Sequence, residues 1–180
     1  MKSIRIIPIV LMGLFMLVSC NQGETLQQYY VNNSEKADFL VIDIPSSILK
    51  VSEIDLTPQQ KEAYNSIKKL NVLAYRIRPN STVDFESEKQ KINEILSNDR
   101  YQELMRINMG DKKGVVKYLG DDDAIDEVIV FGSQDSLGFA LIRVLGNDMK
   151  PENMTKLMEV VQKGNMDGEG LSQLANFFGE

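Results

Sequence analysis

Five stretches of the chain have the residue pattern of β-strands, and short turns join the last four. The first strand, residues 72–78, places Leu73, Tyr75 and Ile77 on one face. The other four are residues 101–109, 115–119, 127–131 and 139–145. Links of a few Gly, Asp and Ser residues are too short for crossover connections, so we expect these four strands to form an antiparallel meander.

Apolar residues at helical spacing lie before and between these strands. Residues 26–30 have the pattern of a short helix, and residues 46–51 that of another, after an apolar extended stretch at residues 39–45. Thr57 is the expected N-cap of a longer helix, with Pro58 at its first position and Gln60 in the capping-box position. This helix would carry an apolar stripe of Ala63, Tyr64, Ile67 and Leu70.

Three further helices complete the expected elements. One covers residues 84–96, one begins near Pro151, and a short one lies at the C-terminus. The helix near Pro151 has apolar residues at helical spacing and would cover the sheet. Together the elements predict an α+β fold: a mainly antiparallel five-stranded sheet, with a four-strand C-terminal meander and helices packed on one face.

The N-terminal residues follow a different pattern, that of a secretory signal. Lys2 and Arg5 precede an apolar run over residues 6–18, which is shorter than the ~20 residues of a spanning helix. Leu-Val-Ser-Cys at residues 17–20 then matches the bacterial lipobox. We therefore predict cleavage between Ser19 and Cys20 and acylation of Cys20 with chains such as palmitate. The alternative is an ordinary signal peptide with an incidental cysteine.

This interpretation divides the chain into a signal peptide at residues 1–19, a lipidated tether at 20–25 and a single α+β domain at 26–180. Each buried methylene of an acyl chain contributes ~0.8 kcal/mol, so two or three chains anchor the protein firmly. No dense acidic run follows Cys20, so nothing favours display on the cell surface. The predicted location is the bacterial cell envelope, on the periplasmic side of the outer membrane.

Composition indicates a folded domain with an acidic surface. Hydrophobic residues make up 43% of the chain and charged residues 26%, which is enough apolar material for a core. Removal of residues 1–19 takes two basic residues and no acidic one, so 20 basic residues fall to 18 against 26 acidic, and the net charge changes from −6 to −8. Nucleic acid is not expected as a partner because its binding needs a basic surface.

The residue types exclude several classes of catalytic chemistry. The chain has no His and no Trp, and Cys20 is its only cysteine. Catalysis through Ser-His-Asp or Cys-His, zinc sites of Cys and His, and internal disulfides are thereby excluded. Residues 47–50 and 66–69 fit the Ser-x-x-Lys pattern, but the partner motifs of that class of hydrolase are missing. We expect no catalytic residue, no cofactor and no metal.

Two acidic segments offer oxygen atoms to calcium but lack its binding pattern. Asp121, Asp122, Asp123, Asp126 and Glu127 do not have the alternate spacing of a calcium loop. The loop at residues 165–170 lacks the Glu that would close such a site at its twelfth position. Solvated turns are the favoured interpretation of both segments.

Arginines within the predicted strands form a candidate partner-binding face. Strand alternation places three of them opposite the apolar residues of their strands, and the fourth shares its side with two apolar residues. The face would comprise Arg76, Arg78, Arg106, Arg143, Phe139 and Leu141. Guanidinium groups mixed with apolar surface suit a protein or an anionic ligand. The alternative is an ordinary exposed face whose arginines pair with acidic neighbours across strands.

One short pattern suggests a modification. Asp135-Ser136-Leu137 lies in the turn between the last two predicted strands and fits the Asp-Ser/Thr-apolar pattern that Bacteroides-like bacteria use for O-glycosylation of exported proteins. Exposed turns are places where a bulky glycan is tolerated. Ser136 is therefore a candidate O-glycosylation site.

Several of these segments together resemble a known family. They are the lipobox, residues 39–49 with Asp43-Ile44-Pro45 at their centre, the capped helix that leads into residues 69–75, and the strands at residues 101–106 and 139–146. Over about residues 25–176 the chain resembles small envelope lipoproteins of Bacteroides-like bacteria, classed as domain-of-unknown-function family 4252. The resemblance implies an extracytoplasmic lipoprotein domain without an established activity, so it carries over no functional residue.

Two classes of function follow from these observations. The favoured one is a lipid-anchored, periplasm-facing envelope protein that is not an enzyme and binds an envelope protein or an anionic ligand. The alternative is a small hydrolase or carrier that acts on envelope material, for which we would expect a deep pocket with convergent polar groups. A flat sheet face would favour the first, and an enclosed cavity with buried carboxylates the second.

Overall fold

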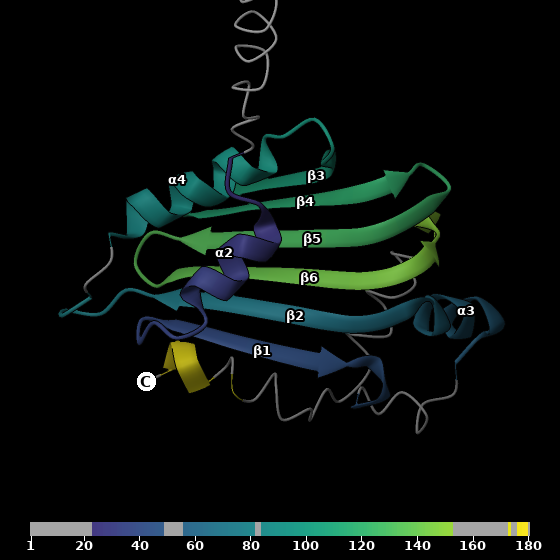
Figure 1. The fold of residues 1–180 in the computed structure, drawn as a ribbon, viewed down its shortest axis with the longest axis horizontal. Coiled ribbons are helices and arrows are strands. Elements are labelled where there is room, and N and C mark those ends of the chain that lie inside the picture. The colour runs from purple at the N-terminus through teal and green to yellow at the C-terminus, as the bar shows by residue number, and fades with distance from the viewer. Residues whose placement is uncertain (1–22, 49–55, 82–83, 153–172, 174–175, 180) are drawn as a thin grey trace, which may run out of the picture.

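The computed structural model describes residues 23–48, 56–81, 84–152, 173 and 176–179. Its centre is an antiparallel sheet of six strands in the order β1-β2-β6-β5-β4-β3 (Figure 1). The strands are β1 (Phe39–Pro45), β2 (Ile67–Arg76), β3 (Gln102–Met109), β4 (Lys112–Asp121), β5 (Ala124–Gln134) and β6 (Gly138–Met149). The helices are α2 (Leu26–Asn33), α3 (Pro58–Ser66) and α4 (Phe85–Leu96), with a 3-10 turn at η2 (Ser46–Ile48).

Each of the three helices begins at a capping side chain. The predicted capping box of Thr57 and Gln60 is present at α3, and Thr25 and Gln28 form a second box at α2. At α4 the carboxylate of Asp84 accepts a hydrogen bond from the backbone N–H of Ser87. These contacts satisfy N–H groups that have no partner within the helix, and so they fix where each helix starts.

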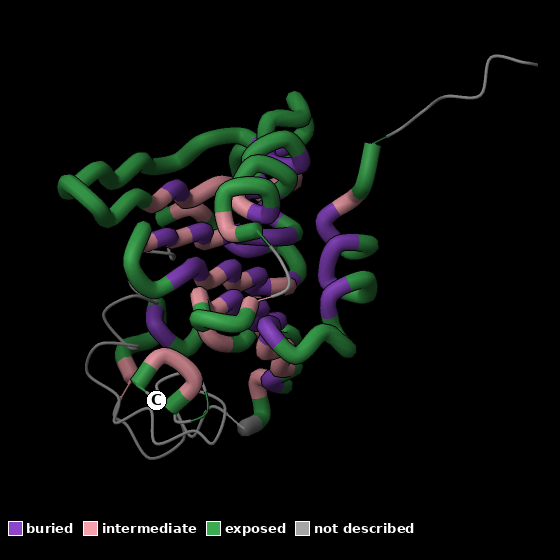
Figure 2. Tube along the Cα trace, turned by 90° about the vertical axis from the view of Figure 1, so that its left-hand side faces the viewer, coloured by how far each residue is buried: buried purple, intermediate pink, exposed green. Residues whose placement is uncertain are grey.

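Helices α2 and α4 pack on the same face of the sheet, which we call the covered face. Its core is built around Tyr29, Ile92, Tyr75, Phe139 and Leu141, which are all nearly inaccessible to solvent. Phe139 stacks on Tyr75 at 5.2 Å between ring centroids. A smaller apolar cluster that includes Val128 and Met149 lies elsewhere in the sheet. Figure 2 shows that buried positions concentrate in the middle strands and on the inner side of α2.

The chain order leaves β3 at a sheet edge. Strand β2 lies near one side of the sheet and β3 at the other, so the chain must cross the sheet between them. It does so through α4, which packs on the covered face. The β3–β4 hairpin then returns toward the middle of the sheet, and among the described strands β3 pairs with β4 alone (Figure 1).

The α+β class and the meander of the last four strands are confirmed, but the strand count was one too low. The apolar stretch Phe39–Pro45 pairs with β2 from Tyr75 to Lys69, and so it forms the sixth strand. The helix that begins after Thr57 also ends earlier than predicted, at Ser66. Ile67 is already extended, with φ −87° and ψ 133°, because it begins β2 and pairs with Gly146.

Some predicted elements lie outside the described residues. Residues 1–22, which include the predicted signal peptide, Ser19, Cys20 and the first part of the tether, are not described. Of the predicted helix near Pro151, only Pro151 and Glu152 are described, and both are helical. At the C-terminus, residue 173 and residues 176–179 are helical. Within the described part of the chain, no helix is long and apolar enough to span a membrane.

Candidate functional site

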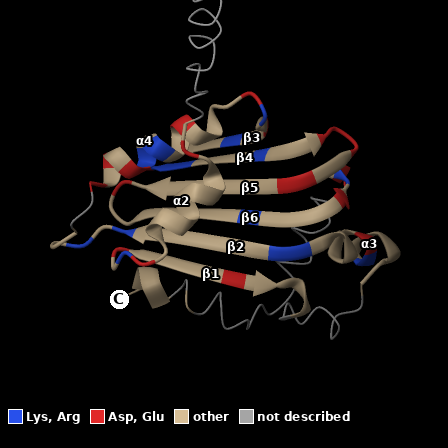
Figure 3. Ribbon diagram, viewed as in Figure 1, with Lys and Arg blue, Asp and Glu red and all other residues tan. Residues whose placement is uncertain are grey.

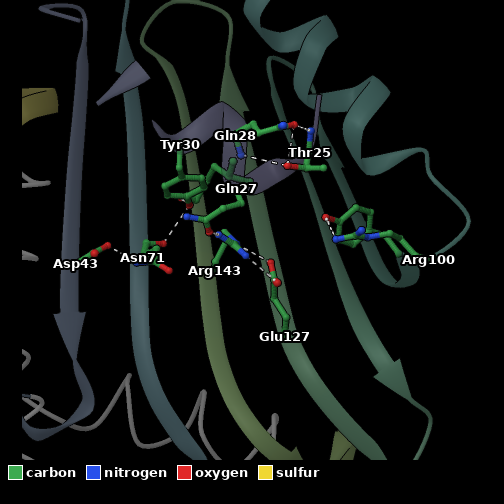
Figure 4. Close-up of polar contacts among 11 residues, drawn as sticks. Thr25, Gln27, Gln28, Tyr30, Asp43, Asn71, Arg100, Glu127 and Arg143 are labelled. Atoms are coloured by element: carbon green, nitrogen blue, oxygen red, sulfur yellow. Dashed lines mark hydrogen bonds and ion pairs between the residues drawn. The ribbon is translucent and has the colours of Figure 1, made fainter. Parts of the chain in front are cut away.

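A row of polar side chains crosses the covered face beneath α2 (Figure 4). Asp43 on β1, Asn71 on β2 and Arg143 on β6 are direct neighbours in the strand register. The side-chain amide of Asn71 donates to the carboxylate of Asp43. Arg143 makes two parallel hydrogen bonds to Glu127 on β5, with N–O distances of 2.6 and 2.9 Å. Such a bidentate pair has a fixed geometry.

Helix α2 closes this row from above. The side-chain oxygen of Gln27 accepts a hydrogen bond from Arg143 at 2.9 Å, and the guanidinium carbon lies 5.4 Å from the centre of the Tyr30 ring. The hydroxyl of Tyr30 lies 2.7 Å from the carbonyl oxygen of Leu141 and 3.1 Å from that of Asn71. The row therefore holds α2 on the sheet by polar contacts that also fix its position.

The charge state of the row is set by these contacts. Burial alone would lower the pKa of Arg143, but the hydrogen bonds and charge of Glu127 outweigh burial and raise it. Burial is also the main cause of the raised pKa of Tyr30. Both groups keep their protons at neutral pH, and within the described residues every buried side-chain N or O atom has a hydrogen-bond partner. The row is therefore organised to support the fold.

A second buried carboxylate joins α2 to α4. Glu88 accepts a hydrogen bond from the Tyr29 hydroxyl at 2.7 Å and pairs with Lys91 at 2.7 Å. Burial first, and then the hydrogen bond to Glu88, raise the pKa of Tyr29. This carboxylate is also fully engaged, so it has the same structural character as Glu127.

Two depressions in the described surface are open to solvent. One, of about 590 Å³, lies beside the last residues of β1, at Asp43, Pro45, Lys68, Lys69, Leu145 and Gly146. The other, of about 230 Å³, lies between α4 and the β3–β4 hairpin. Neither contains Glu127 or Glu88, the buried carboxylates.

The outer edge of the sheet has a different character. All eight residues of β3 are exposed. They include four large apolar side chains: Leu104 at 44% exposure, Met105 at 48%, Ile107 at 40% and Met109 at 64%. Met105 pairs with Val116, Ile107 with Gly114 and Met109 with Lys112, so the side chains of Met105, Ile107 and Met109 lie on the face opposite to α2 and α4. We call Leu104, Met105, Ile107 and Met109, together with the β3 backbone, the β3 edge.

The other side of β3 is charged. Arg106 pairs with Val115 in the strand register and points to the covered face, where its guanidinium binds Glu103. The hydrogen bond from Arg106 lowers the pKa of Glu103, and the same contact raises that of Arg106. Arg106, Lys89 and Lys113 line the smaller depression, so basic groups gather here in an acidic chain (Figure 3).

The predicted arginine face does not form. Arg76 lies on the face opposite to Tyr75 and donates to the carbonyl oxygen of Phe177 at 2.9 Å. Arg78 follows β2, and its guanidinium carbon lies 5.6 Å from the centre of the Phe177 ring. Arg106 and Arg143 are on the covered face, one exposed and one buried.

The apolar members of that predicted face are also placed elsewhere. Phe139 and Leu141 are at 1% and 0% exposure, in the core under α2 and α4. Strand alternation separates the two sides of each strand but does not tell which side the helices cover, and both sides of β6 are apolar. The prediction assigned Arg143, Phe139 and Leu141 to the open side, and this was wrong.

Other predicted residues lie where the turns were expected. Ser136 is exposed between β5 and β6, in the turn of residues 135–137, and its glycosylation stays a prediction. In the turn of residues 122–123, Asp122 accepts a hydrogen bond from the Tyr118 hydroxyl at 2.6 Å. Across the described ranges, no three acidic side chains gather in a way that would hold a metal ion.

Only weak sequence signals point to the buried arginine–glutamate pair and to the exposed strand. Arg143 lies in an apolar strand and Glu127 begins another, so a buried pair was the natural alternative to an exposed one. The alternation of Met105, Ile107 and Met109 indicates a strand with one buried side. The edge position of that strand exposes this side instead, and edge position depends on the order of all six strands.

Comparison with known families matches residues 29–157, more than half of the chain, to the domain of unknown function DUF4252. The chain belongs to this family. No curated protein matches the DUF4252 chain. Among solved structures, the chain is similar to the crystal structure of the protein of unknown function PA94 from Pseudomonas aeruginosa, with 9% sequence identity and a TM-score of 0.32. The match covers 72% of this chain and 80% of that one.

Proposed function

We propose that this DUF4252 protein is a lipid-anchored, periplasm-facing envelope protein that acts as a binding module through its β3 edge. The observation that carries the proposal is the exposure of all eight β3 residues, four of them large and apolar. Monomeric proteins usually cover or shorten an edge strand of this kind. Its unpaired backbone N–H and C=O groups and exposed apolar side chains would otherwise pair with another chain.

The chemistry of the β3 edge suits a polypeptide in extended conformation. An added strand would take its main-chain hydrogen bonds from the outer side of β3 and place alternate side chains against Met105, Ile107 and Met109. On the other side, Arg106 lines the smaller depression, and its guanidinium could bind carboxylate or carbonyl oxygen atoms of the partner. Within the described sheet, β3 is the last strand and pairs with β4.

The proposal of a non-enzymatic role is supported by the state of the buried titratable groups. Glu127 is paired with Arg143 and Glu88 with Lys91. A catalytic acid or base needs access to substrate. The described depressions are open and are not lined by either of these two carboxylates, which favours binding at the surface over catalysis.

The lipid anchor would place the module close to the membrane. Residues 21–25 separate Cys20 from the first turn of α2. At up to ~3.5 Å per residue, five residues reach roughly 17 Å. The module would then meet partners that are themselves held at the envelope.

Site-specific photo-crosslinking in the intact envelope tests the docking surface. A photoreactive amino acid replaces Met105, Ile107 or Met109 in the full chain, and Val31 on α2, which is 62% exposed, provides the control position. We expect discrete crosslinked products from the β3 positions and none from position 31. If all three β3 positions give only monomer, the β3 edge is not a docking surface.

Metabolic labelling with a fatty-acid analogue tests the anchor independently. The wild-type chain should carry the label and sediment with membranes, whereas Cys20→Ala should lose both properties. A Cys20→Ala chain that stays labelled and membrane-bound would contradict the anchor while leaving the proposal for the β3 edge open to its own test.

A further inference from the structure

We infer that the partner of the β3 edge is a second copy of this chain, paired antiparallel to β3 about a two-fold axis at Ile107. The inference rests on the proposed function, because it names the partner of the same surface. Two sheets would then join into one continuous sheet across the β3 edges.

Over residues 105–109, the apolar side chains of β3 are placed symmetrically about Ile107. Residues 105–109 read Met-Arg-Ile-Asn-Met, with Met105 and Met109 equally far from the centre. In an antiparallel pair, residues directly opposite each other point to the same face. A copy turned about Ile107 therefore places Met105 opposite the second Met109, and the two Ile107 side chains opposite each other. The apolar row of one copy continues into that of the other.

The polar face selects the same register. With Ile107 on the axis, Arg106 lies opposite Asn108 of the second copy, and the amide oxygen of Asn108 is an acceptor for a guanidinium. A shift of the axis to Arg106 would place two arginines opposite each other, which is unfavourable. A shift to Asn108 would leave Met105 without an apolar partner. Of these registers, only the one centred on Ile107 pairs all five residues with compatible neighbours.

The shape of β3 limits pairing to these five residues. The register of β3 with β4 shifts between Glu103 and Met105, so the strand is irregular before Met105. Gly110, with φ 65°, begins the turn after Met109. The regular part of the edge is therefore residues 105–109, and its midpoint is Ile107.

The size of this interface fits a membrane-held dimer. Five residues span roughly 17 Å of strand at ~3.3 Å per residue, so the contact is short. Anchoring both copies to one membrane raises their effective concentration and strengthens a contact of modest affinity. For this reason the test uses the full chain in its native envelope.

Cysteine crosslinking measures both the partner and the register. The wild-type chain sets the background, because Cys20 is its only cysteine. Ile107→Cys should give a disulfide-linked dimer under mild oxidation, since directly opposed strand residues have Cα atoms about 4.5–5.5 Å apart, within disulfide range. Met105→Cys, matched in exposure, should stay at background alone, because its two copies would lie roughly 13 Å apart along the strands.

A mixture of two tagged chains completes the register test. Met105→Cys and Met109→Cys, co-expressed with different tags, should form a mixed disulfide dimer that neither chain gives with itself. The inference is overturned if Ile107→Cys stays at background, or if Met105→Cys alone crosslinks as readily as Ile107→Cys.

The two proposals can fail separately. Photo-crosslinked products at Met105 with a mass other than twice that of the chain, together with unlinked Ile107→Cys, would keep the β3 edge as a docking surface and reject the second copy as its occupant. Absence of both kinds of product would reject the docking surface itself.

Discussion

Two arginine–glutamate pairs lie on the same face of the sheet and differ strongly in burial. The Arg143–Glu127 pair, at 2.6 Å, has side chains 8% and 6% exposed, beneath α2. The Arg106–Glu103 pair, on β3, has side chains 66% and 37% exposed. Strands β6 and β5 are central, whereas β3 is an edge. The same two residue types therefore support the fold in one place and remain available to solvent in the other.

The difference shows how strand order assigns roles to similar side chains. In the centre of the sheet, the guanidinium of Arg143 donates hydrogen bonds to Gln27 and Glu127 and lies over the ring of Tyr30. Its binding capacity is therefore engaged within the chain. At the edge, the one ion-pair partner of Arg106 among the described residues is Glu103, three residues away in its own strand. An exposed pair of this kind contributes little to stability, because water and salt screen it. Under the proposal for the β3 edge, it would exchange its partner at little cost when another chain binds.

The largest effect is expected from separating the buried pair. Arg143→Met leaves the Glu127 carboxylate buried without its partner, and such a loss typically costs about 3–5 kcal/mol in the free energy of unfolding. Urea unfolding measures this change. The double variant Arg143→Met with Glu127→Leu should recover most of the loss, because no buried charge then remains. If Arg143→Met alone were as stable as the double variant, then leaving the Glu127 carboxylate buried without Arg143 would carry no cost, and the prediction would be wrong.

A smaller effect is expected at Tyr30. Tyr30→Phe removes the hydroxyl that serves the buried carbonyl oxygens of Asn71 and Leu141 and should cost about 1–3 kcal/mol. Tyr118→Phe is the matched control, because its hydroxyl binds Gln102 and Asp122, where water can replace it. Urea unfolding of both variants gives the comparison. If both variants lost the same free energy of unfolding, the buried hydrogen bonds of Tyr30 would contribute no more to stability than the accessible ones of Tyr118.

The central pair and the edge pair also show what could be learned from sequence. Period-two alternation and short turns predicted β3–β6, and the Thr57 capping box predicted the start of α3. Both signals depend on neighbours a few residues apart. The burial of Arg143 and the exposure of Ile107 depend on which strand lies beside which, and on α4 crossing the same face as α2. No local pattern contains that information.

The pairing of Phe39–Pro45 with β2 has the same origin. The stretch is apolar and extended in the sequence, but whether it pairs depends on β2, which begins 22 residues after Pro45. Likewise, Ile67 fits a helical stripe after Ala63, and its extended backbone follows from its pairing with Gly146 on β6. Tertiary pairing decides such borderline segments.

At the β3 edge, substitution should affect association far more than stability. Replacing Met105, Ile107 and Met109 together with Thr keeps residues that favour strands and should change the free energy of unfolding by less than ~1 kcal/mol. The Ile107-centred dimer should disappear, as measured by chemical crosslinking in the envelope. Leu137→Thr, at another exposed apolar position, is the control and should retain the dimer. A large loss of stability would instead assign the β3 side chains to the fold.

The smallest effect on stability is expected from the exposed Arg106–Glu103 pair itself. The direction in which this effect changes with pH can be predicted. The hydrogen bond from Arg106 lowers the pKa of Glu103 in the folded protein below the unfolded value. The pair therefore stabilises the fold above the unfolded pKa, and this contribution is lost as pH falls through the folded pKa. Glu103→Gln should give an unfolding midpoint slightly below that of the wild type at pH 7 and equal to it in strong acid, and added salt should remove the difference at neutral pH. Glu127→Gln, the matched change in the buried pair, should be clearly destabilised at pH 7, and salt should not restore it. If the two variants responded alike to salt, burial would not be what separates the two pairs.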